Sequence, residues 1–123
     1  MKVVAAIISN GDYFLIAQRS KNKHLALKWE FPGGKVNKGE SLKNALKREI
    51  KEELNIEIAI HKKIGKELYQ DEKINITIYY FKCTKSFGKI YLNEHEDVKW
   101  ILIKDMHNYD FAEADARIVK KLI

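Results

Sequence analysis

Hydrophobic and polar positions in the first third of the chain predict two strands, a loop and a short extended segment. The unbroken apolar run from Val3 to Ser9 has the pattern of a strand buried on both faces, and the Asn10-Gly11 pair after it marks a tight hairpin turn. Residues 13–18 (YFLIAQ) return as a second strand. The polar, basic stretch 21–28 predicts a loop, and residues 29–34 (WEFPGG) predict an extended piece interrupted by a proline and a glycine pair.

A helical period begins after Ser41, which is a favourable N-cap residue, and runs to about Leu54. The apolar residues of this stretch are Leu42, Ala45, Leu46, Ile50 and Leu54. They fall on one stripe of the helix surface, so the helix should pack one face against the core.

The next part of the chain predicts further strands. Residues 56–60 and 66–70 have an extended pattern, and residues 74–83 are rich in the Ile, Thr, Tyr and Phe that are typical of a strand. Tyr91 and residues 98–103 suggest two more strand segments around the polar turn NEHED.

Residues 112–123 close the chain as a helix with apolar side chains available to face the core. Strands and helices in this order predict an α/β domain in which a mixed sheet is covered by helices. The 123 residues are enough for one such domain and too few for two, and no repeat, linker or low-complexity tract divides them. We therefore expect a single domain over residues 1–123.

Composition and charge limit the possible cellular environment and the possible binding partners of the protein. With 46% hydrophobic and 33% charged residues, the chain has the composition of an ordinary soluble protein, and no apolar run approaches the roughly 20 residues that span a bilayer. The N-terminus has no signal-peptide cleavage pattern, and the single cysteine, Cys83, cannot form an internal disulfide, so we expect a cytoplasmic protein. The net charge of +6 suits anionic partners such as nucleotides, nucleic acid or phosphates.

The last two turns of the predicted helix carry charge of the unfavourable sign. A helix C-terminus has partial negative charge and favours Lys or Arg, yet Glu49, Glu52 and Glu53 lie there on one side of the helix. One local ion pair is available, Arg48 with Glu52, and it has the weaker, basic-before-acidic order. Local pairing should therefore leave most of this charge unanswered. A hard divalent cation such as Mg²⁺, which takes oxygen ligands, would neutralise it.

The segment around these carboxylates resembles the signature of the Nudix hydrolases. The matching positions are Gly34, Glu40, Arg48, Glu49, Ile50, Glu52, Glu53 and Ile56. One position departs, because Asn55 stands where the family has glycine; asparagine also tolerates the left-handed conformation that ends a helix. Outside the signature, residues 17–35, 93–100 (NEHEDVKW) and 113–115 (EAD) resemble the small MutT-type branch of the family.

The resemblance implies a Nudix-type α/β/α sandwich, with a mixed β-sheet between helices, and an enzyme that depends on Mg²⁺, with Mn²⁺ as a substitute. The metal ligands that it implies are the carboxylates of Glu49, Glu52, Glu53 and Glu94 and the backbone carbonyl of Gly33. Arg48 is expected to orient the neighbouring carboxylates, and Glu40 to act as an outer ligand through water. Gly34 completes the glycine pair, whose bare backbone allows close approach of an ion.

The general base that the resemblance implies is Glu94 in the NEHED turn. Glu49 and Glu53 are alternatives, and Glu96 is a rival in the same loop. The remaining histidines outside the basic loop, His61, His95 and His107, show no metal-ligand spacing and are expected at the surface.

Five substrate contacts also follow from the resemblance. They are Arg19 at the α-phosphate, His24 in a loop that closes over the nucleotide, Phe31 at the base, Lys35 near the phosphates and Asp115 at the base. Each has a structural alternative: Arg19, His24 and Lys35 suit a surface, Phe31 suits the core, and Asp115 suits a helix N-cap.

Asp115 is compatible with two kinds of substrate. A carboxylate accepts a hydrogen bond from the amino group of cytosine, whereas a protonated carboxyl donates one to an oxidised purine. The resemblance favours 8-oxo-dGTP over CTP or dCTP, with release of the monophosphate and pyrophosphate, and therefore a role in nucleotide-pool sanitisation and DNA repair. Dinucleoside polyphosphates, ADP-ribose or RNA 5′ ends are alternative substrates, and a non-catalytic nucleotide-binding module is a remote alternative. We expect a monomer or homodimer without membrane or stable nucleic-acid partners.

Overall fold

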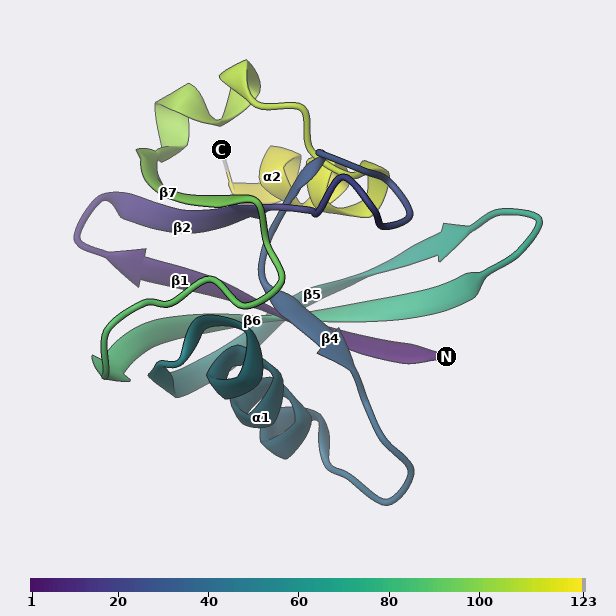
Figure 1. Cartoon of the computed structure of the whole chain (residues 1–123), viewed down its shortest axis with the longest axis horizontal. Coiled ribbons are helices and arrows are strands. Elements are labelled where there is room, and N and C mark those ends of the chain that lie inside the picture. The colour runs from purple at the N-terminus through teal and green to yellow at the C-terminus, as the bar shows by residue number, and fades with distance from the viewer. Residues whose placement is uncertain (123) are drawn as a thin grey trace.

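Strand β1 (Lys2–Asn10) is the centre of the sheet, because it pairs along both of its edges. The computed structural model, which describes residues 1–122, places β6 (Asn75–Phe87) parallel to β1 on one edge. On the other edge, β2 (Tyr13–Gln18) pairs with the C-terminal end of β1, and β4 (Gly33–Lys35) pairs with its N-terminal half. The partner of β1 thus changes partway along the strand, and β2 and β4 lead away in different directions (Figure 1).

Short strands extend the sheet beyond β2. Strand β3 (Trp29–Glu30) pairs antiparallel with the end of β2, and β7 (Asp97–Leu102) pairs antiparallel with its whole length. The parallel pairing of β1 with β6 and the antiparallel pairs elsewhere make the sheet mixed, as the sequence predicts.

Strand β5 (Glu57–Gln70) is continuous, so the prediction of two separate extended segments at 56–60 and 66–70 is wrong. It pairs with β6 along the whole hairpin, with register shifts between Ile60 and Lys62 and between Lys63 and Gly65. In the sequence, the polar, glycine-containing middle of β5 suggests a break between two strands. In the structure, β-bulges accommodate the extra residues, and the strand stays paired with β6.

Helix α1 (Leu42–Leu54) begins and ends as its sequence predicts. The Ser41 side chain accepts a hydrogen bond from the Asn44 amide at 3.1 Å, which satisfies one of the free N–H groups of the first turn. At the other end Asn55 has φ 61° and ψ 29°, the left-handed conformation expected for the residue that replaces the family glycine.

The C-terminal part of the chain differs from prediction in two places. The loop before β7 holds Tyr91, which is in no strand. Ile103, predicted as the end of the strand at 98–103, instead begins the 3-10 helix η1 (Ile103–Asn108). Helix α2 (Glu113–Leu122) starts one residue later than predicted; Ile123, the last residue of the predicted helix, lies outside the described residues.

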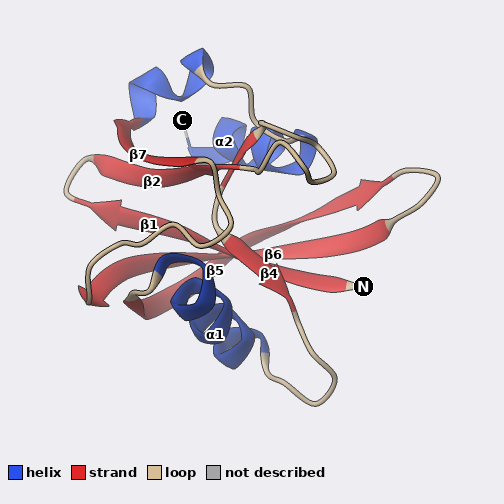
Figure 2. Cartoon of the chain, in the orientation of Figure 1, coloured by secondary structure: helices blue, strands red, loops and turns tan. Residues whose placement is uncertain are grey.

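Two hydrophobic cores lie on opposite faces of the sheet, one under each helix. Residues such as Leu46, Ile50 and Leu54 of α1 pack on one face, and Ile118 and Val119 of α2 pack on the other. This arrangement confirms the predicted α/β sandwich with a mixed sheet between helices (Figure 2). Cys83 lies in β6, where residues 74–83 were predicted to form a strand, and it is buried.

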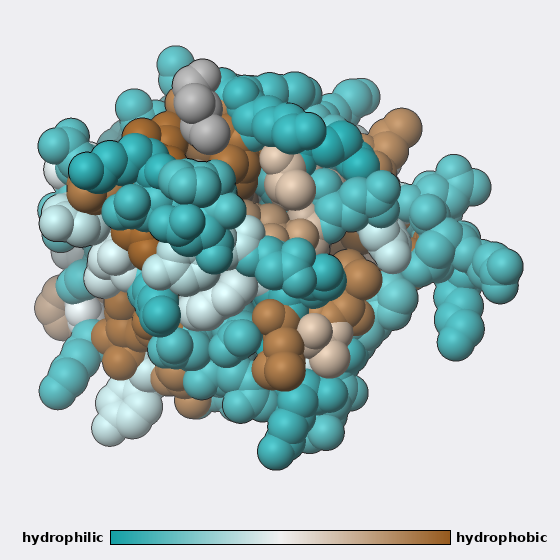
Figure 3. All heavy atoms as spheres, turned by 90° about the horizontal axis from the view of Figure 1, so that it is seen from above, coloured by the Kyte–Doolittle hydropathy of each residue, from teal (hydrophilic) through white to brown (hydrophobic). Residues whose placement is uncertain are grey.

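Seen from above, the end of the molecule that carries α2 is covered mostly by hydrophilic residues, with hydrophobic residues between them (Figure 3). None of the helices within residues 1–122 combines the length and the apolar character needed to cross a membrane.

Neither glycine of strand β4 has room for a side chain, and this can be tested. A Cβ added at Gly33 would lie 1.9 Å from the Val4 carbonyl oxygen, whereas one added at Gly34 would lie 2.2 Å from Oε2 of the Glu49 side chain. We expect Gly33→Ala to lower the free energy of unfolding by about 3 kcal/mol, because backbone must separate from backbone. Gly34→Ala should lower the free energy of unfolding by less, because the Glu49 side chain can rotate away from the added methyl group. Urea unfolding of both variants measures the effect, and Gly33→Ala should be the less stable of the two.

Candidate active site

Arg48 gathers the carboxylates along one side of α1. Its Nε and Nη2 donate to the two oxygens of Glu40 at 2.7 and 3.0 Å, and its Nη1 lies 2.9 Å from Oε1 of Glu49 and 3.3 Å from Oε2 of Glu52. The guanidinium holds the pKa of Glu40 down to about 2, chiefly through its hydrogen bonds. Glu49 and Glu52 thus share one guanidinium with Glu40, so a single positive charge faces three carboxylates and local pairing leaves most of their negative charge unanswered.

Glu53 is the carboxylate that this pairing does not reach. It is 7% exposed, and its Oε1 is buried without a hydrogen-bond partner among the described residues. Burial, together with the negative charges of Glu30, Glu49 and Glu94, raises the pKa of Glu53 to about 9. The side chain thus occupies a position where its ionised form needs a positive partner.

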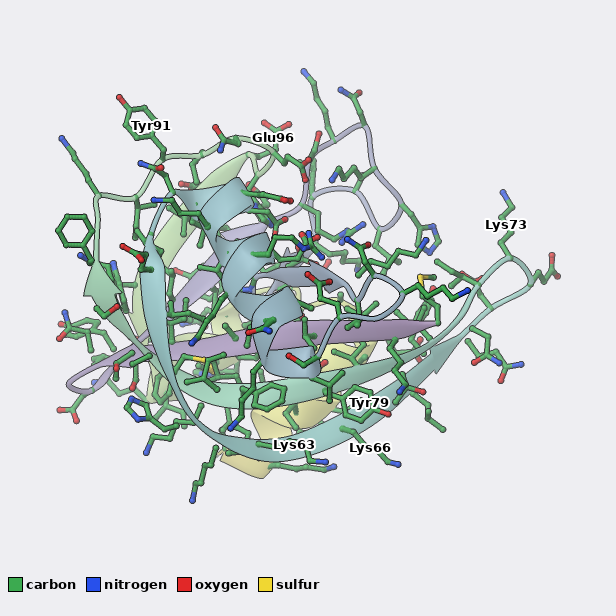
Figure 4. All side chains as sticks on the ribbon, turned by 90° about the horizontal axis from the view of Figure 1, so that it is seen from below. Lys63, Lys66, Lys73, Tyr79, Tyr91 and Glu96 are labelled. Carbon is green, nitrogen blue, oxygen red and sulfur yellow. The ribbon has the colours of Figure 1, made fainter. Side chains whose placement is uncertain are left out.

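The loop of residues 88–96 is fastened to the last turn of α1. The amides of Tyr91 and Asn93 donate to the carbonyls of Leu54 and Glu53 at 2.9 and 3.2 Å, and the Asn93 side chain donates to the carbonyl of Glu52. Helix C-terminal carbonyls lack partners within the helix, so the loop satisfies them. Figure 4 shows Tyr91 of this loop near the end of α1, far from Lys73 at the tip of the β5–β6 hairpin.

The same loop brings one of its two candidate bases to the carboxylates. Glu94 faces the cavity beside Glu53 and forms an ion pair of 2.9 Å with Lys23, which lowers the pKa of Glu94 mainly by hydrogen bonding. Glu96 instead accepts a hydrogen bond from the Lys21 amide, and its own amide donates to the Gln18 carbonyl. Glu96 therefore anchors the loop of residues 19–28, and the geometry favours Glu94.

His95 is buried, so its expected surface position is wrong. Its side chain is 4% exposed, and Nε2 lies 2.9 Å from Oε2 of Glu30 and 3.9 Å from Oε2 of Glu53. Neither His95 nor Glu30 was identified from the sequence as a site residue. The signal for both was weak: each is a polar residue beside one that was identified, Glu94 in one case and Phe31 in the other.

Arg19 and His24 fasten the basic loop rather than projecting freely. Arg19 Nη1 pairs with Oε1 of Glu30 at 2.8 Å, and its Nε donates to the His24 carbonyl at 2.7 Å. His24 Nε2 lies 3.2 Å from both the Tyr69 hydroxyl and Oδ2 of Asp71, across on the β5–β6 hairpin. Both residues line cavities of the site, and neither is an isolated surface side chain.

Asp115 lies inside the first turn of α2 and does not cap it, so the N-cap interpretation is wrong. The side chain is buried; Oδ2 accepts from the Phe31 amide at 2.9 Å, and Oδ1 accepts from the Tyr80 hydroxyl. Burial, with the negative charge of Glu30, raises the pKa of Asp115 to about 7 even though both hydrogen bonds act to lower it. The Phe31 ring is itself buried in the core against Tyr80 and Phe111.

These groups surround two adjoining cavities. The acidic cavity, about 280 Å³, is lined by Glu30, Glu49, Glu53, Glu94 and His95 together with Lys23, Lys35, Gly33 and Gly34. The apolar cavity, about 270 Å³, is lined by Leu25, Ile74, Ile76, Ile78 and Ala114 together with His24 and Tyr69. Arg19, Glu30 and Asp115 line both, so the two cavities form one continuous site.

The acidic cavity fits a divalent cation by its chemistry. No three Asp, Glu, His or Cys side chains within residues 1–122 already converge as a metal cluster. However, the unpartnered oxygen of Glu53 and the mutual repulsion of the carboxylates around it are relieved by a hard cation with oxygen ligands. Glu52, with a side chain 59% exposed, lies at the outer edge of this group.

The α/β sandwich thus carries a carboxylate-lined cavity suited to a divalent cation, which is a setting for hydrolysis of phosphate anhydrides. A family model described as the NUDIX domain matches residues 1–122, and the chain belongs to this family of hydrolases.

The chain is similar in sequence to named relatives over nearly its whole length. It is 33% identical over 120 residues to an 8-oxo-dGTP diphosphatase of Buchnera aphidicola, covering 98% of this chain and 91% of that protein. It is 32% identical over 120 residues to the CTP pyrophosphohydrolase of Escherichia coli, covering 98% and 89%. Among solved structures, a MutT protein of methicillin-resistant Staphylococcus aureus is 36% identical with a TM-score of 0.80, covering 99% of this chain and 94% of that one.

Glu53 makes the stability of the cation-free protein depend on pH. The folded state keeps the Glu53 proton up to a pKa of about 9, whereas the unfolded chain releases it near 4.5, so unfolding releases a proton in this window and stability falls as pH rises from 5 to 9. We expect this residue to contribute a slope approaching about 1 kcal/mol per pH unit. Urea unfolding in EDTA should show that Glu53→Gln removes this part of the slope.

Glu57→Gln, at an exposed position on β5, is the control and should keep the wild-type slope. Equal slopes in wild type and Glu53→Gln would show that the buried carboxyl does not hold its proton.

Proposed function

We propose that the protein is a Mg²⁺-dependent nucleoside triphosphate pyrophosphohydrolase of the MutT type that converts oxidised (d)NTPs, 8-oxo-dGTP foremost, to the monophosphate and pyrophosphate. The main support is the continuous site: a carboxylate-lined cavity suited to a cation and phosphates opens into an apolar cavity that ends on the buried Asp115. The named activity of the Buchnera aphidicola relative supports the same substrate.

In this proposal the cation is Mg²⁺, for which Mn²⁺ can substitute. The groups that would hold it are the carboxylates of Glu49, Glu52, Glu53 and Glu94 and the Gly33 carbonyl. When bound, the ion supplies positive charge to the phosphate oxygens, which is the main requirement of phosphoryl-type displacement. Arg48 fixes Glu49 and Glu52 and also binds Glu40, which we propose as an outer ligand that reaches the ion through water.

Glu94 is our proposed general base, with Glu49 and Glu53 as the alternatives. Its carboxylate lies in the acidic cavity, and Lys23 keeps it ionised and able to accept a proton from water. Lys35, exposed at the edge of the same cavity, adds positive charge for the phosphates. Arg19 contributes at the α-phosphate with the part of its guanidinium that Glu30 does not use.

Base recognition is proposed for Asp115 with the backbone of Phe31. A pKa of about 7 means that the carboxyl is protonated below neutral pH and ionised above it. The protonated form donates to an oxidised purine, and the ionised form accepts from the amino group of cytosine. CTP is therefore the second candidate substrate, and the named activity of the Escherichia coli relative supports it.

We place this activity in the cytoplasm, where hydrolysis of oxidised triphosphates would keep them out of newly made DNA. The loop that carries His24 is fastened across the apolar cavity to Tyr69 and Asp71, so it is positioned to cover a bound nucleotide.

The proposed cation site predicts a large loss of rate without its buried carboxylate. Wild type should release pyrophosphate from 8-oxo-dGTP only with Mg²⁺ or Mn²⁺. Glu53→Gln should lower kcat about 10²–10³-fold, because the cation that stabilises transition-state charge loses one of its ligands. Glu57→Gln is the matched control and should keep the wild-type rate. Absence of pyrophosphate release by folded wild type with any nucleoside triphosphate would indicate a binding module instead.

The proposed role of Asp115 predicts a pH-dependent choice of base. The ratio of kcat/KM for 8-oxo-dGTP to that for CTP should fall as pH rises through about 7, because the carboxyl loses the proton that it donates. Asp115→Asn, which does not ionise, should flatten this ratio between pH 6 and 8. Asp12→Asn, in the exposed turn after β1, should leave it unchanged. An unchanged pH profile in Asp115→Asn would remove Asp115 from base recognition.

A further inference from the structure

His95 occupies a fixed, enclosed place in the site without belonging to any role assigned so far. The residues on either side of it are held by backbone hydrogen bonds: the amide of Asn93 donates to Glu53 and the amide of Glu96 donates to Gln18. The ring itself is 4% exposed and lines the acidic cavity. The imidazole is therefore held in one place between α1 and β3.

The ring nitrogen Nε2 lies between two carboxylates. It is 2.9 Å from Oε2 of Glu30 and 3.9 Å from Oε2 of Glu53. Because an ionised carboxylate only accepts hydrogen bonds, Nε2 carries the proton and donates it to Glu30. The other oxygen of Glu30 accepts from Arg19 Nη1 at 2.8 Å. Glu30 thus accepts hydrogen bonds from Arg19 and from His95. Of these two donors, His95 is the one that lies between Glu30 and Glu53.

Packing alone does not explain a histidine here. Its Nδ1 is buried and has no hydrogen-bond partner among the described residues, so an apolar ring would fill the space without leaving a polar atom unsatisfied. What an apolar ring cannot supply is the N–H between Glu30 and Glu53. Once Glu53 ionises to receive a cation, the two carboxylates would face each other directly without that donor, and repulsion would turn one of them away.

We propose that His95 is a positioning residue, whose Nε2–H fixes Glu30 and keeps the Glu53 carboxylate directed into the acidic cavity where it receives the divalent cation. The inference rests on the proposed function for its effect on turnover, but its effect on cation binding does not require any substrate. The proposed role is indirect, because His95 acts through Glu30 and Glu53.

Two amide variants test the position of the donor. Glutamine can place an N–H near the site of Nε2, whereas the shorter asparagine reaches only the site of Nδ1 and leaves Glu30 without this donor. Binding of Mn²⁺ alone, followed by electron paramagnetic resonance, should weaken about 10–100-fold in His95→Asn and stay within a few-fold of wild type in His95→Gln. With nucleotide, kcat should follow the same order while KM changes little.

Two further variants complete the experiment. His107→Asn, at an exposed position in η1, is the control and should bind Mn²⁺ like wild type. Combining His95→Asn with Glu30→Gln should add little to the loss caused by Glu30→Gln alone, because both changes break the same contact. Unfolding midpoints of all variants show whether the fold is kept.

Equal Mn²⁺ affinity in folded His95→Asn, His95→Gln and wild type would overturn the proposal and leave His95 as a packing residue. Equal losses in the two amide variants, or full additivity with Glu30→Gln, would also overturn it. If Mn²⁺ binding follows the predicted order but wild type hydrolyses no nucleoside triphosphate, the positioning role stands and the proposed function fails.

Discussion

Repulsion among carboxylates is the constraint on which this site depends. Glu53 is buried at the C-terminal end of a helix, beside Glu30, Glu49 and Glu94, where both the helix and its neighbours disfavour a negative charge. Such a group persists only when the surrounding structure holds it there, and much of the nearby architecture does so. Arg48 restrains three carboxylates, Glu40, Glu49 and Glu52, and the loop of residues 88–96 uses the free carbonyls of α1 to bring Glu94 close.

The backbone around the site is specialised for the same purpose. Gly33 and Gly34 let β4 lie against β1 and beside Glu49 at distances that no side chain would allow. The half of β1 that pairs with β4 contributes Val3, Val4 and Ala5 to the cavity that Arg19, Glu30, Glu49 and Glu53 also line. The site therefore draws on both α-helices, on strands β1, β3, β4, β5 and β6, and on the loops of residues 19–28 and 88–96, although three of its carboxylates lie in one short segment of sequence.

Local features of the chain were predictable because short-range chemistry determines them. The cap at Ser41, the left-handed Asn55, the buried run of β1 and the stripe of α1 all follow from residue type and spacing. Long-range contacts were not predictable in this way. Nothing in the neighbourhood of His95 indicates burial, because its partner Glu30 is far away in sequence and only the docking of the loop on α1 brings them together. The bulged middle of β5 was missed for a similar reason, since the partner strand supplies its regularity.

Glu30 and Phe31 are consecutive residues, and this has a consequence for how such an enzyme diverges. The side chain of Glu30 is fixed beside the carboxylates, while the amide of Phe31 holds the buried acid of the apolar cavity. A mutation that shifts this dipeptide moves both halves of the site together. If Asp115 reads the base as we propose, lineages that acquire a new base preference by adjusting this segment would also change their turnover rate, and compensating changes should accumulate in the loop before β7.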